Sequence, residues 1–161
     1  MIMALLISGL ASAQDAKPME SPRDSITAKA GSATITINYS SPSVRDRKIW
    51  GSLVPYGQVW RAGANAATTF TTDKDIKVEG KTLPAGTYSF FAIPTEGDWT
   101  LIFNKTAKQW GAYKYDTTQD ALRVTVKPIK SATKSERLVY AINTNGFTLN
   151  WDDTTVPVSI K

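Results

Sequence analysis

The stretch Asn145-Gly146-Phe147-Thr148-Leu149-Asn150-Trp151 decides the fold class of this chain. It opens with Asn-Gly, the strongest short-range signal for a β-hairpin, because both residues tolerate a positive φ. Apolar and polar residues then alternate, so Phe147, Leu149 and Trp151 share one face of an extended segment. The stretch therefore predicts an antiparallel hairpin strand with one buried face and one face in water.

The same period of two recurs along the chain from Ser25 onward. Four further segments show it clearly: 34–39, 76–79, 122–127 and 156–160. The alternation is weaker over 88–93 and 99–103, which fits strands that are buried on both faces. Glycine-containing turns such as Glu79-Gly80 separate these segments at a spacing of roughly 8–12 residues.

About eight strands at this spacing predict an all-β fold, either an antiparallel β-sandwich or a flattened barrel, with little helix. Only 106–110 and 117–121 could form a helical turn. A parallel α/β fold is excluded because no segment could serve as a crossover helix. The chain has 161 residues, of which 42% are hydrophobic, so it can bury a core as a single domain.

Two absent residue types limit the chemistry, since the chain contains no histidine and no cysteine. A Cys nucleophile, a disulfide, a zinc–thiolate site and a Ser-His-Asp triad are therefore all excluded. Acid–base or nucleophilic work would fall to carboxylates, Lys, Tyr, Ser or Thr. We expect no cofactor, no bound metal and no catalytic residue.

The formal net charge is +5, which raises the question of a nucleic-acid partner. The basic residues are spread along the whole chain, with no run of five or more lysines or arginines. This distribution is typical of a mildly basic, solvated surface, and we do not expect nucleic-acid binding.

The N-terminus has the pattern of an export signal. Residues 1–10 are apolar but too short to span a bilayer, and Ala11-Ser12-Ala13 follows as a small-residue cleavage pattern. An export signal normally carries a positive charge before its apolar run, but no Lys or Arg stands there in this chain. Either the α-amine supplies that charge or the true start lies upstream. The alternative to an export signal is a buried N-terminal helix. We expect a signal peptide at 1–13, a flexible leader at 14–21 and one β-sandwich domain at 22–161. The protein would then be exported to the periplasm or the extracellular space, without a transmembrane segment.

The connection from Tyr39 to Asn65 reads YSSPSVRDRKIWGSLVPYGQVWRAGAN and is long for a link between two strands. Loops of this length and composition are usually either functional or packed as a lid over one end of a barrel or sandwich. Guanidinium groups bind carboxylates, phosphates or sugar hydroxyls, and indole faces stack on sugars or cations. The loop predicts a binding site for an anionic or glycan ligand, built from Arg45, Arg47, Trp50, Tyr56, Trp60, Arg61 and Asn65.

A purely structural interpretation of the same loop is also open. In it, Trp50 and Trp60 plug the core, and Arg61 ties the loop down through buried carbonyl groups. The aromatic stretch 110–116 could extend the binding surface, although we favour a strand there, with Trp110 capping the core. We interpret Asp152-Asp153-Thr154-Thr155 as a turn between two strands rather than as a calcium site or half of a glycosidase pair.

Five segments together resemble a known bacterial family: YSSPSVRDRKIWG, LVPYGQVWRAGAN, VEGKTLPAGTYSFFAIP, WTLIFNK and WGAYKYD. The family is catalogued as domain of unknown function 2911, and its members are typical of Bacteroidetes-type bacteria and usually follow an export signal. The resemblance covers about residues 21–161 and implies no assigned activity. Where the family commonly has Gly-Arg after the Ser-Pro segment, this chain has Asp46-Arg47.

The function that we expect is a non-catalytic binding module of the cell envelope, for a small molecule, a glycan or a partner protein. One alternative is a hydrolase that acts on envelope carbohydrate or peptide through carboxylates. Another is a structural subunit of an envelope assembly, in which an exposed edge strand over 154–161 pairs with a partner. A hollow that holds two acids would favour the hydrolase.

Overall fold

The computed structural model describes residues 20–161, in which all paired strands are antiparallel. The larger sheet has six strands in the order β1-β2-β3-β6-β7-β8. Their bounds are Arg23–Ala30 (β1), Ala33–Ser40 (β2), Thr68–Thr72 (β3), Gly86–Ile93 (β6), Trp99–Asn104 (β7) and Asp120–Val126 (β8). The predicted signal peptide at 1–13, and the predicted leader up to residue 19, lie outside the described residues.

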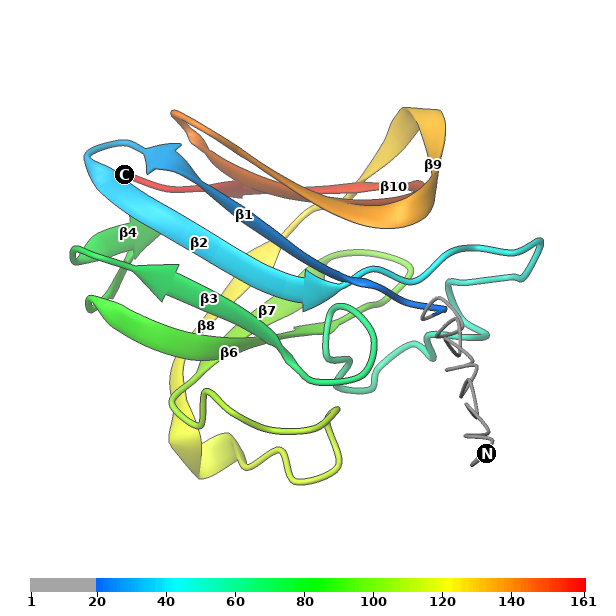
Figure 1. The fold of residues 1–161 in the computed structure, drawn as a ribbon, viewed down its shortest axis with the longest axis horizontal. Helices are drawn as coiled ribbons and strands as arrows, with labels where there is room; N and C mark the ends of the chain where they lie inside the picture. The colour runs from blue at the N-terminus through cyan, green and yellow to red at the C-terminus, as the bar shows by residue number, and fades with distance from the viewer. Residues whose placement is uncertain (1–19) are drawn as a thin grey trace, which may run out of the picture.

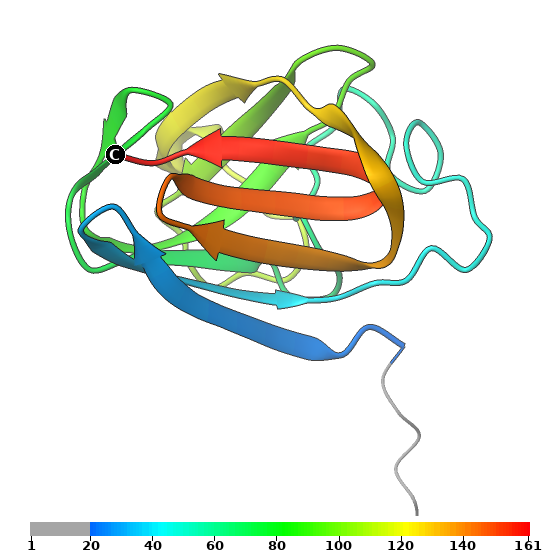
Figure 2. The same ribbon diagram turned by 90° about the horizontal axis from the view of Figure 1, so that it is seen from above.

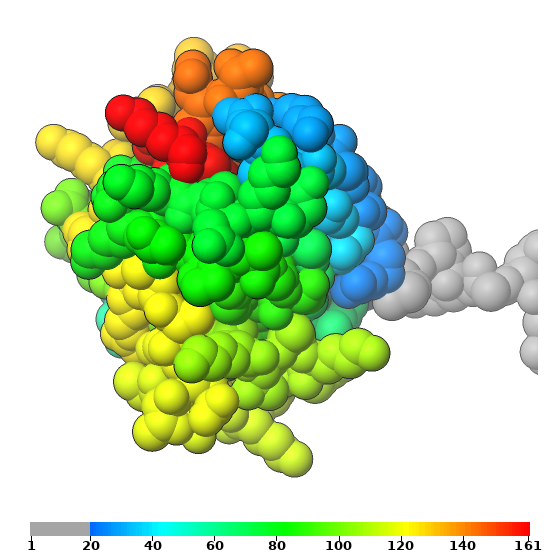
Figure 3. Space-filling view, turned by 90° about the vertical axis from the view of Figure 1, so that its left-hand side faces the viewer, coloured from blue at the N-terminus to red at the C-terminus, as the bar shows by residue number. Residues whose placement is uncertain are grey.

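The other four strands form two hairpins, β4 (Ile76–Val78) with β5 (Lys81–Leu83) and β9 (Ile129–Asn143) with β10 (Gly146–Ser159). β9 and β10 lie over one face of the large sheet (Figure 1). β10 doubles back where its register with β9 shifts, so its two halves lie side by side (Figure 2). The chain then pairs with β4, and the C-terminal segment and β4–β5 together cover one end of the molecule (Figure 3). The predicted all-β sandwich is confirmed, with open rather than closed sheets.

The core lies between these two layers because the alternating segments turn their apolar faces toward each other. Ile35 and Ile37 of β2 are buried, as are Leu149 and Trp151 of β10. The Phe147 ring bridges the layers, with its centroid 5.5 Å from Phe70 and 5.8 Å from Phe90. Burial of this apolar area is the main stabilising term for the sandwich.

β6 and β7 are buried on both faces, as their weak alternation predicted. Their second face carries a smaller apolar cluster, in which Phe91 and Ile102 are fully buried. Ala112 and Tyr115 cover it from the connection between β7 and β8. That connection ends in a 3₁₀ turn at Thr117–Gln119, within the segment predicted to be helical, whereas 106–110 is not helical.

The Asn145-Gly146 turn forms the expected hairpin, but a positive φ at both residues is not the reason. Only Gly146 has a positive φ, of 147°, and Asn145 does not. A Cβ atom on Gly146 would lie 1.9 Å from the carbonyl oxygen of Val158, in the other half of β10. The glycine is therefore required by the close approach of the two halves of β10.

Candidate functional site

The connection between β2 and β3 covers the end of the sandwich opposite to β4–β5 (Figure 1). Backbone hydrogen bonds fix it to three neighbouring elements. Trp60 exchanges two of them with Ala92 of β6, at 2.8 and 2.9 Å. Leu138 of β9 donates to the Pro42 carbonyl, and Ala64 donates to Ser40 at the end of β2. The loop is long, but its main chain is held in place.

One buried corner of this loop positions Arg61. Ala62 has a φ of 53°, and its carbonyl oxygen accepts hydrogen bonds from Tyr140 Oη at 2.6 Å and from Thr68 Oγ1 at 3.0 Å. Desolvation raises the pKa of the Tyr140 hydroxyl far above its ordinary value of 10.0, since the ring is fully buried. The neutral hydroxyl is therefore a permanent donor to this corner, next to the arginine.

Four tryptophans meet beneath the loop and form a single cluster. Trp50 lies at its centre, with ring centroids 4.9 Å from Trp99, 5.6 Å from Trp60 and 5.8 Å from Trp151. Trp99 and Trp151 are buried, and Trp50 and Trp60 are half-buried. The two loop indoles pack against the core, as the structural interpretation predicted. The cluster also separates two hollows in the surface.

The first hollow, which we call the arginine hollow, has a volume of about 230 Å³. Six of its lining residues define it: Arg45, Arg47, Leu53, Trp60, Arg61 and Trp151. Four of these belong to the predicted site. The loop therefore brings three guanidinium groups and the edge of the tryptophan cluster to one concave surface.

Main-chain carbonyls hold two of these guanidinium groups in fixed positions. Arg47 donates from Nη2 to Ser43 O at 2.6 Å and from Nε to Val44 O at 2.9 Å. Arg61 donates from Nη1 to Asn65 O at 2.8 Å, which is the tie predicted by the structural interpretation. A guanidinium has five N–H donors, so both side chains keep donors for another partner.

Arg45 enters the hollow from a tight turn. Arg45 and Asp46 have φ values of 51° and 56°, and Arg47 N donates to Val44 O at 3.1 Å, which is the pattern of a type I′ turn. The positive φ at Asp46 explains why a glycine suits this position in the resembling family. The Arg45 side chain forms an exposed ion pair with Glu20, with 3.4 Å between Nη1 and Oε1.

A second hollow adjoins the first. It has a volume of about 420 Å³ and shares Leu53, Val54, Trp60 and Arg61 with the arginine hollow. Tyr113 forms its far wall, so we call it the tyrosine hollow. The two hollows therefore adjoin, with Arg45 lining the first and Tyr113 lining the second.

The segment 110–116 differs from the strand that we favoured. It forms turns apart from one bridge between Trp110 and Ala66, and Trp110 is 63% exposed rather than a cap on the core. Tyr113 is 83% exposed, whereas Tyr115 packs on Phe91 with 5.1 Å between ring centroids. The turns arise because Gly111 has a positive φ of 62°. Of the three aromatic residues, Tyr113 extends the surface next to Arg61.

The remaining predicted site residues lie elsewhere. Trp50 and Tyr56 line a third hollow, of about 260 Å³, on the other side of the tryptophan cluster. Asn65 lines none of the three hollows and contributes its carbonyl oxygen to Arg61. The predicted set is therefore divided between two surfaces.

The third hollow contains charged residues that the sequence did not single out as a group. Glu96 comes from the β6–β7 turn, Lys130 from β9 and Asp153 from the irregular part of β10. Because this hollow contains two acids, Glu96 and Asp153, we call it the carboxylate hollow. The only sequence signal for it was Asp152-Asp153, which we interpreted as a turn.

Two other predicted features can be compared with the structure. Residues 154 and 155 pair with β9, and Ser159 and Lys161 hydrogen-bond to Glu79 and Lys77, so this segment is not a free edge at those positions. Over residues 20–161, no cluster of three or more acidic side chains is arranged to hold a metal ion. In the same range, no helix has the length and apolar character needed to cross a membrane.

A family model described as "Protein of unknown function (DUF2911)" matches the chain over residues 21–160. Neither the curated proteins nor the solved structures include a match to this chain. The family match covers both the sandwich and the loop that carries the three hollows. The chain therefore belongs to the DUF2911 family, as the five resembling segments predicted.

Proposed function

We propose that this protein is an exported, non-catalytic binding module whose arginine hollow holds the acidic unit of a glycan. The observation that carries the proposal is the fixed orientation of the Arg47 and Arg61 guanidinium groups toward one hollow. Because main-chain carbonyls already hold both groups, little side-chain entropy is lost when a ligand binds. The unused N–H donors offer the charge-assisted hydrogen bonds that a carboxylate accepts.

The charge of the hollow supports an anionic ligand. Three arginines line it, and Glu20 at its rim is the one acidic residue among the described lining residues. Glu20 is an exposed partner of Arg45, and exposed ion pairs are weak enough for a ligand carboxylate to replace them. An acid group would therefore meet an excess of positive charge.

The size of the hollow indicates what carries the acid group. Drug-sized ligands occupy pockets of about 300–1,000 Å³, so a hollow of about 230 Å³ suits one small unit. The Trp60 edge offers an apolar surface for the ring carbons of a sugar. The adjoining tyrosine hollow then provides room for a second unit against Tyr113. Two adjoining hollows suit a chain of sugars that contains an acidic unit.

The proposed location follows from the N-terminal sequence. The apolar run and the Ala11-Ser12-Ala13 pattern support export to the periplasm or beyond, where acidic polysaccharides are accessible. A partner protein with an exposed carboxylate is a competing ligand for the same arginines. Leu53 and Trp60 line both hollows and offer apolar surface to successive sugar rings, and so we assign the site to a glycan.

The hydrolase alternative has one observation in its favour, namely the two acids of the carboxylate hollow. A retaining or inverting glycosidase needs one carboxyl group whose apolar surroundings keep it protonated. Glu96 lies on an exposed turn and Asp153 is only half-buried, so neither carboxyl group is enclosed within the fold. Release of free sugar from a methyl glycoside during incubation would overturn the non-catalytic assignment.

The proposal can be tested by NMR titration of the protein with galacturonic acid and, separately, with galactose. We expect galacturonic acid to shift the Arg61 Nε–H and Trp60 indole N–H resonances, and galactose to leave them unchanged. Added salt should weaken the interaction, because the rim of the hollow is exposed. If galacturonic acid leaves both resonances unchanged, the acidic-glycan assignment is wrong.

Two variants give the test its specificity. Arg45→Gln removes a charge without breaking a side-chain tie to the main chain, and Arg61→Lys keeps the charge but loses the planar fork. Each should weaken galacturonic acid binding about tenfold, which is the loss of one charge-assisted hydrogen bond. Lys29→Gln, at the far end of β1, is the matched control for net charge and should bind as the native protein does. Equal affinities for all four proteins would contradict the proposal.

A further inference from the structure

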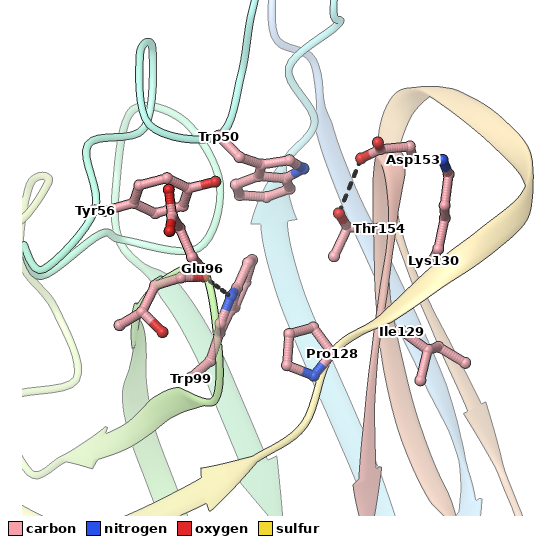
Figure 4. Close-up of a pocket in the computed structure, with 10 residues that line it drawn as sticks. Trp50, Tyr56, Glu96, Trp99, Pro128, Ile129, Lys130, Asp153 and Thr154 are labelled. Carbon is pink, nitrogen blue, oxygen red and sulfur yellow. Dashed lines mark hydrogen bonds between the residues drawn. The ribbon is translucent and has the colours of Figure 1, made fainter.

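The carboxylate hollow has two unlike walls that face each other across an open gap. Trp50, Tyr56 and Trp99 form the aromatic wall, and Lys130, Asp153 and Thr154 form the polar wall (Figure 4). Tyr56 is 39% exposed, so apolar ring surface faces water on the first wall. The polar wall comes from β9 and β10 and offers charged and hydroxyl groups opposite the rings.

The polar wall is directed into the gap by an irregularity in β10. The register between β9 and β10 shifts on both sides of Asp152, which has a φ of 52°. Such bulges redirect a side chain from the regular alternation of a strand. Asp152 thereby lines a hollow on the other side, with Lys48 and Glu136, while Asp153 and Thr154 face the tryptophans.

The charged side chains around the gap retain most of their hydrogen-bonding capacity. Asp153 Oδ1 accepts one hydrogen bond, from Thr154 Oγ1 at 3.0 Å. Over residues 20–161, the side chains of Glu96 and Lys130 form no hydrogen bond and no ion pair. Lys130 and Asp153 therefore stand near each other without closing an ion pair, which leaves a donor and an acceptor side by side.

The aromatic wall carries one further unused donor. Trp50 Nε1 is buried and has no hydrogen-bond partner among the described residues. Figure 4 shows its indole N–H directed toward Asp153 and Thr154 on the opposite wall. An unpaired buried N–H is costly, and native proteins usually satisfy such groups with water or a ligand. Because this N–H is closed off from solvent, an acceptor in the gap reaches it only if a side chain of the wall moves.

We propose that the carboxylate hollow is a second binding site, which holds one neutral sugar unit. The carbon face of a pyranose would pack on the aromatic wall, and its hydroxyl groups, which both donate and accept, would bond to Asp153 and Lys130. A volume of about 260 Å³ suits a single ring.

The charges disfavour an anionic ligand, which would meet the carboxylates of Glu96 and Asp153. A cationic ligand is attracted by these carboxylates and by the ring faces and is repelled by Lys130, so it is the competing class. A neutral polyhydroxyl ring uses the donor and the acceptors of the polar wall alike. This site lies on the other side of the tryptophan cluster from the arginine hollow and does not depend on the function proposed for that hollow.

The test is an NMR titration of the indole N–H resonances with the methyl glycosides of glucose, galactose, mannose and N-acetylglucosamine. The chain has five tryptophans, and the exposed Trp110, which lies outside the hollow, serves as an internal control. We expect at least one glycoside to shift the Trp50 resonance and to leave that of Trp110 unchanged. The absence of a Trp50 shift with all four glycosides would overturn the proposal.

Neighbouring acids provide matched variants. Asp153→Asn should weaken binding about tenfold, whereas Asp152→Asn, one residue away and directed into a different hollow, should have no effect. Glu96→Gln and Asp98→Asn form a second pair on one exposed turn, in which only Glu96 lines the hollow. Equal effects within both pairs would overturn the proposal. Arg45→Gln should leave glycoside binding in the carboxylate hollow unchanged. This variant therefore distinguishes failure of the present proposal from failure of the function proposed for the arginine hollow.

Discussion

The indole of Trp60 lies nearly parallel to that of Trp151, with 6.0 Å between ring centroids and 14° between ring planes. Trp60 belongs to the loop between β2 and β3, and Trp151 belongs to β10, at the other side of the core. The contact joins the loop that carries the arginines to the layer that carries Asp153. Through this contact, the arginine hollow and the carboxylate hollow both depend for their shape on the packed tryptophan cluster.

Replacement of Trp60 by alanine should therefore affect stability as well as binding. A fully buried Trp→Ala change costs about 3–5 kcal/mol, and since Trp60 is half-buried we expect about 2–3 kcal/mol. Urea unfolding gives the value. Trp110→Ala is the control, because that side chain is 63% exposed and its loss should change stability by about 0.5 kcal/mol or less. Similar losses for both variants would show that the cluster does not hold the loop.

Gly51 and Gly80 allow the position of Tyr56 to be tested. Both have a positive φ, of 79° and 81°, but a Cβ atom on Gly51 would lie 2.7 Å from Tyr56 Cε2, whereas Gly80 lies in the β4–β5 turn and its Cβ atom would meet nothing within 4 Å. Each change to alanine should cost about 1–2 kcal/mol for the backbone conformation. Only Gly51→Ala should displace the Tyr56 ring, which NMR shifts of the ring protons would detect. Displacement in both variants, or in neither, would contradict this account of the aromatic wall.

The structure has no room for a residue larger than glycine at Gly146. Its missing Cβ would overlap a main-chain oxygen, that of Val158, which cannot rotate away. We expect Gly146→Ala to cost more than about 3 kcal/mol, or to prevent folding. Gly31→Ala, in the β1–β2 turn with a φ of 58° and free space around it, should cost only about 1–2 kcal/mol. Thermal unfolding compares the two, and equal losses would mean that the halves of β10 can separate.

The sequence pattern predicts the strands whose side chains alternate in burial, such as β2 and β10, because the period of two is visible in the residues themselves. It does not reveal β9, in which residues 130–137 are almost all polar and mostly exposed. It also does not reveal β3, where Phe70 stands between threonines. Backbone pairing with neighbouring strands creates both, and no local pattern records such a partner.

The site was predictable to a similar extent. The composition of the loop pointed to Arg45, Arg47 and Arg61, and the structure brings these three to one hollow. It could not show that Trp50 and Trp60 face different hollows, because that depends on Trp99 and Trp151, which come from distant strands. Likewise, Asp153 enters a hollow only through the irregular register of β10.

The buried hydroxyl of Tyr140 should make the protein sensitive to alkali. Burial raises its pKa in the folded chain, whereas the unfolded chain has the ordinary value of 10.0. Above about pH 10 the unfolded state therefore releases a proton that the folded state keeps, and stability falls by about 1.4 kcal/mol per pH unit for this group. Below about pH 9 both states hold the proton, and the group adds no pH dependence.

Tyr140→Phe should remove this share of the alkaline loss, at the cost of about 1 kcal/mol at neutral pH for the hydrogen bond to Ala62. Urea unfolding between about pH 8 and pH 11 measures both effects. Tyr113→Phe is the control, since Tyr113 is 83% exposed and the loss of its hydroxyl should leave the slope unchanged. Some alkaline loss should persist in Tyr140→Phe, because desolvation also raises the pKa of Tyr39. If Tyr140→Phe and the native protein lose stability at the same rate above pH 10, the Tyr140 hydroxyl does not stay protonated in the fold, and the corner beside Arg61 is not held as described.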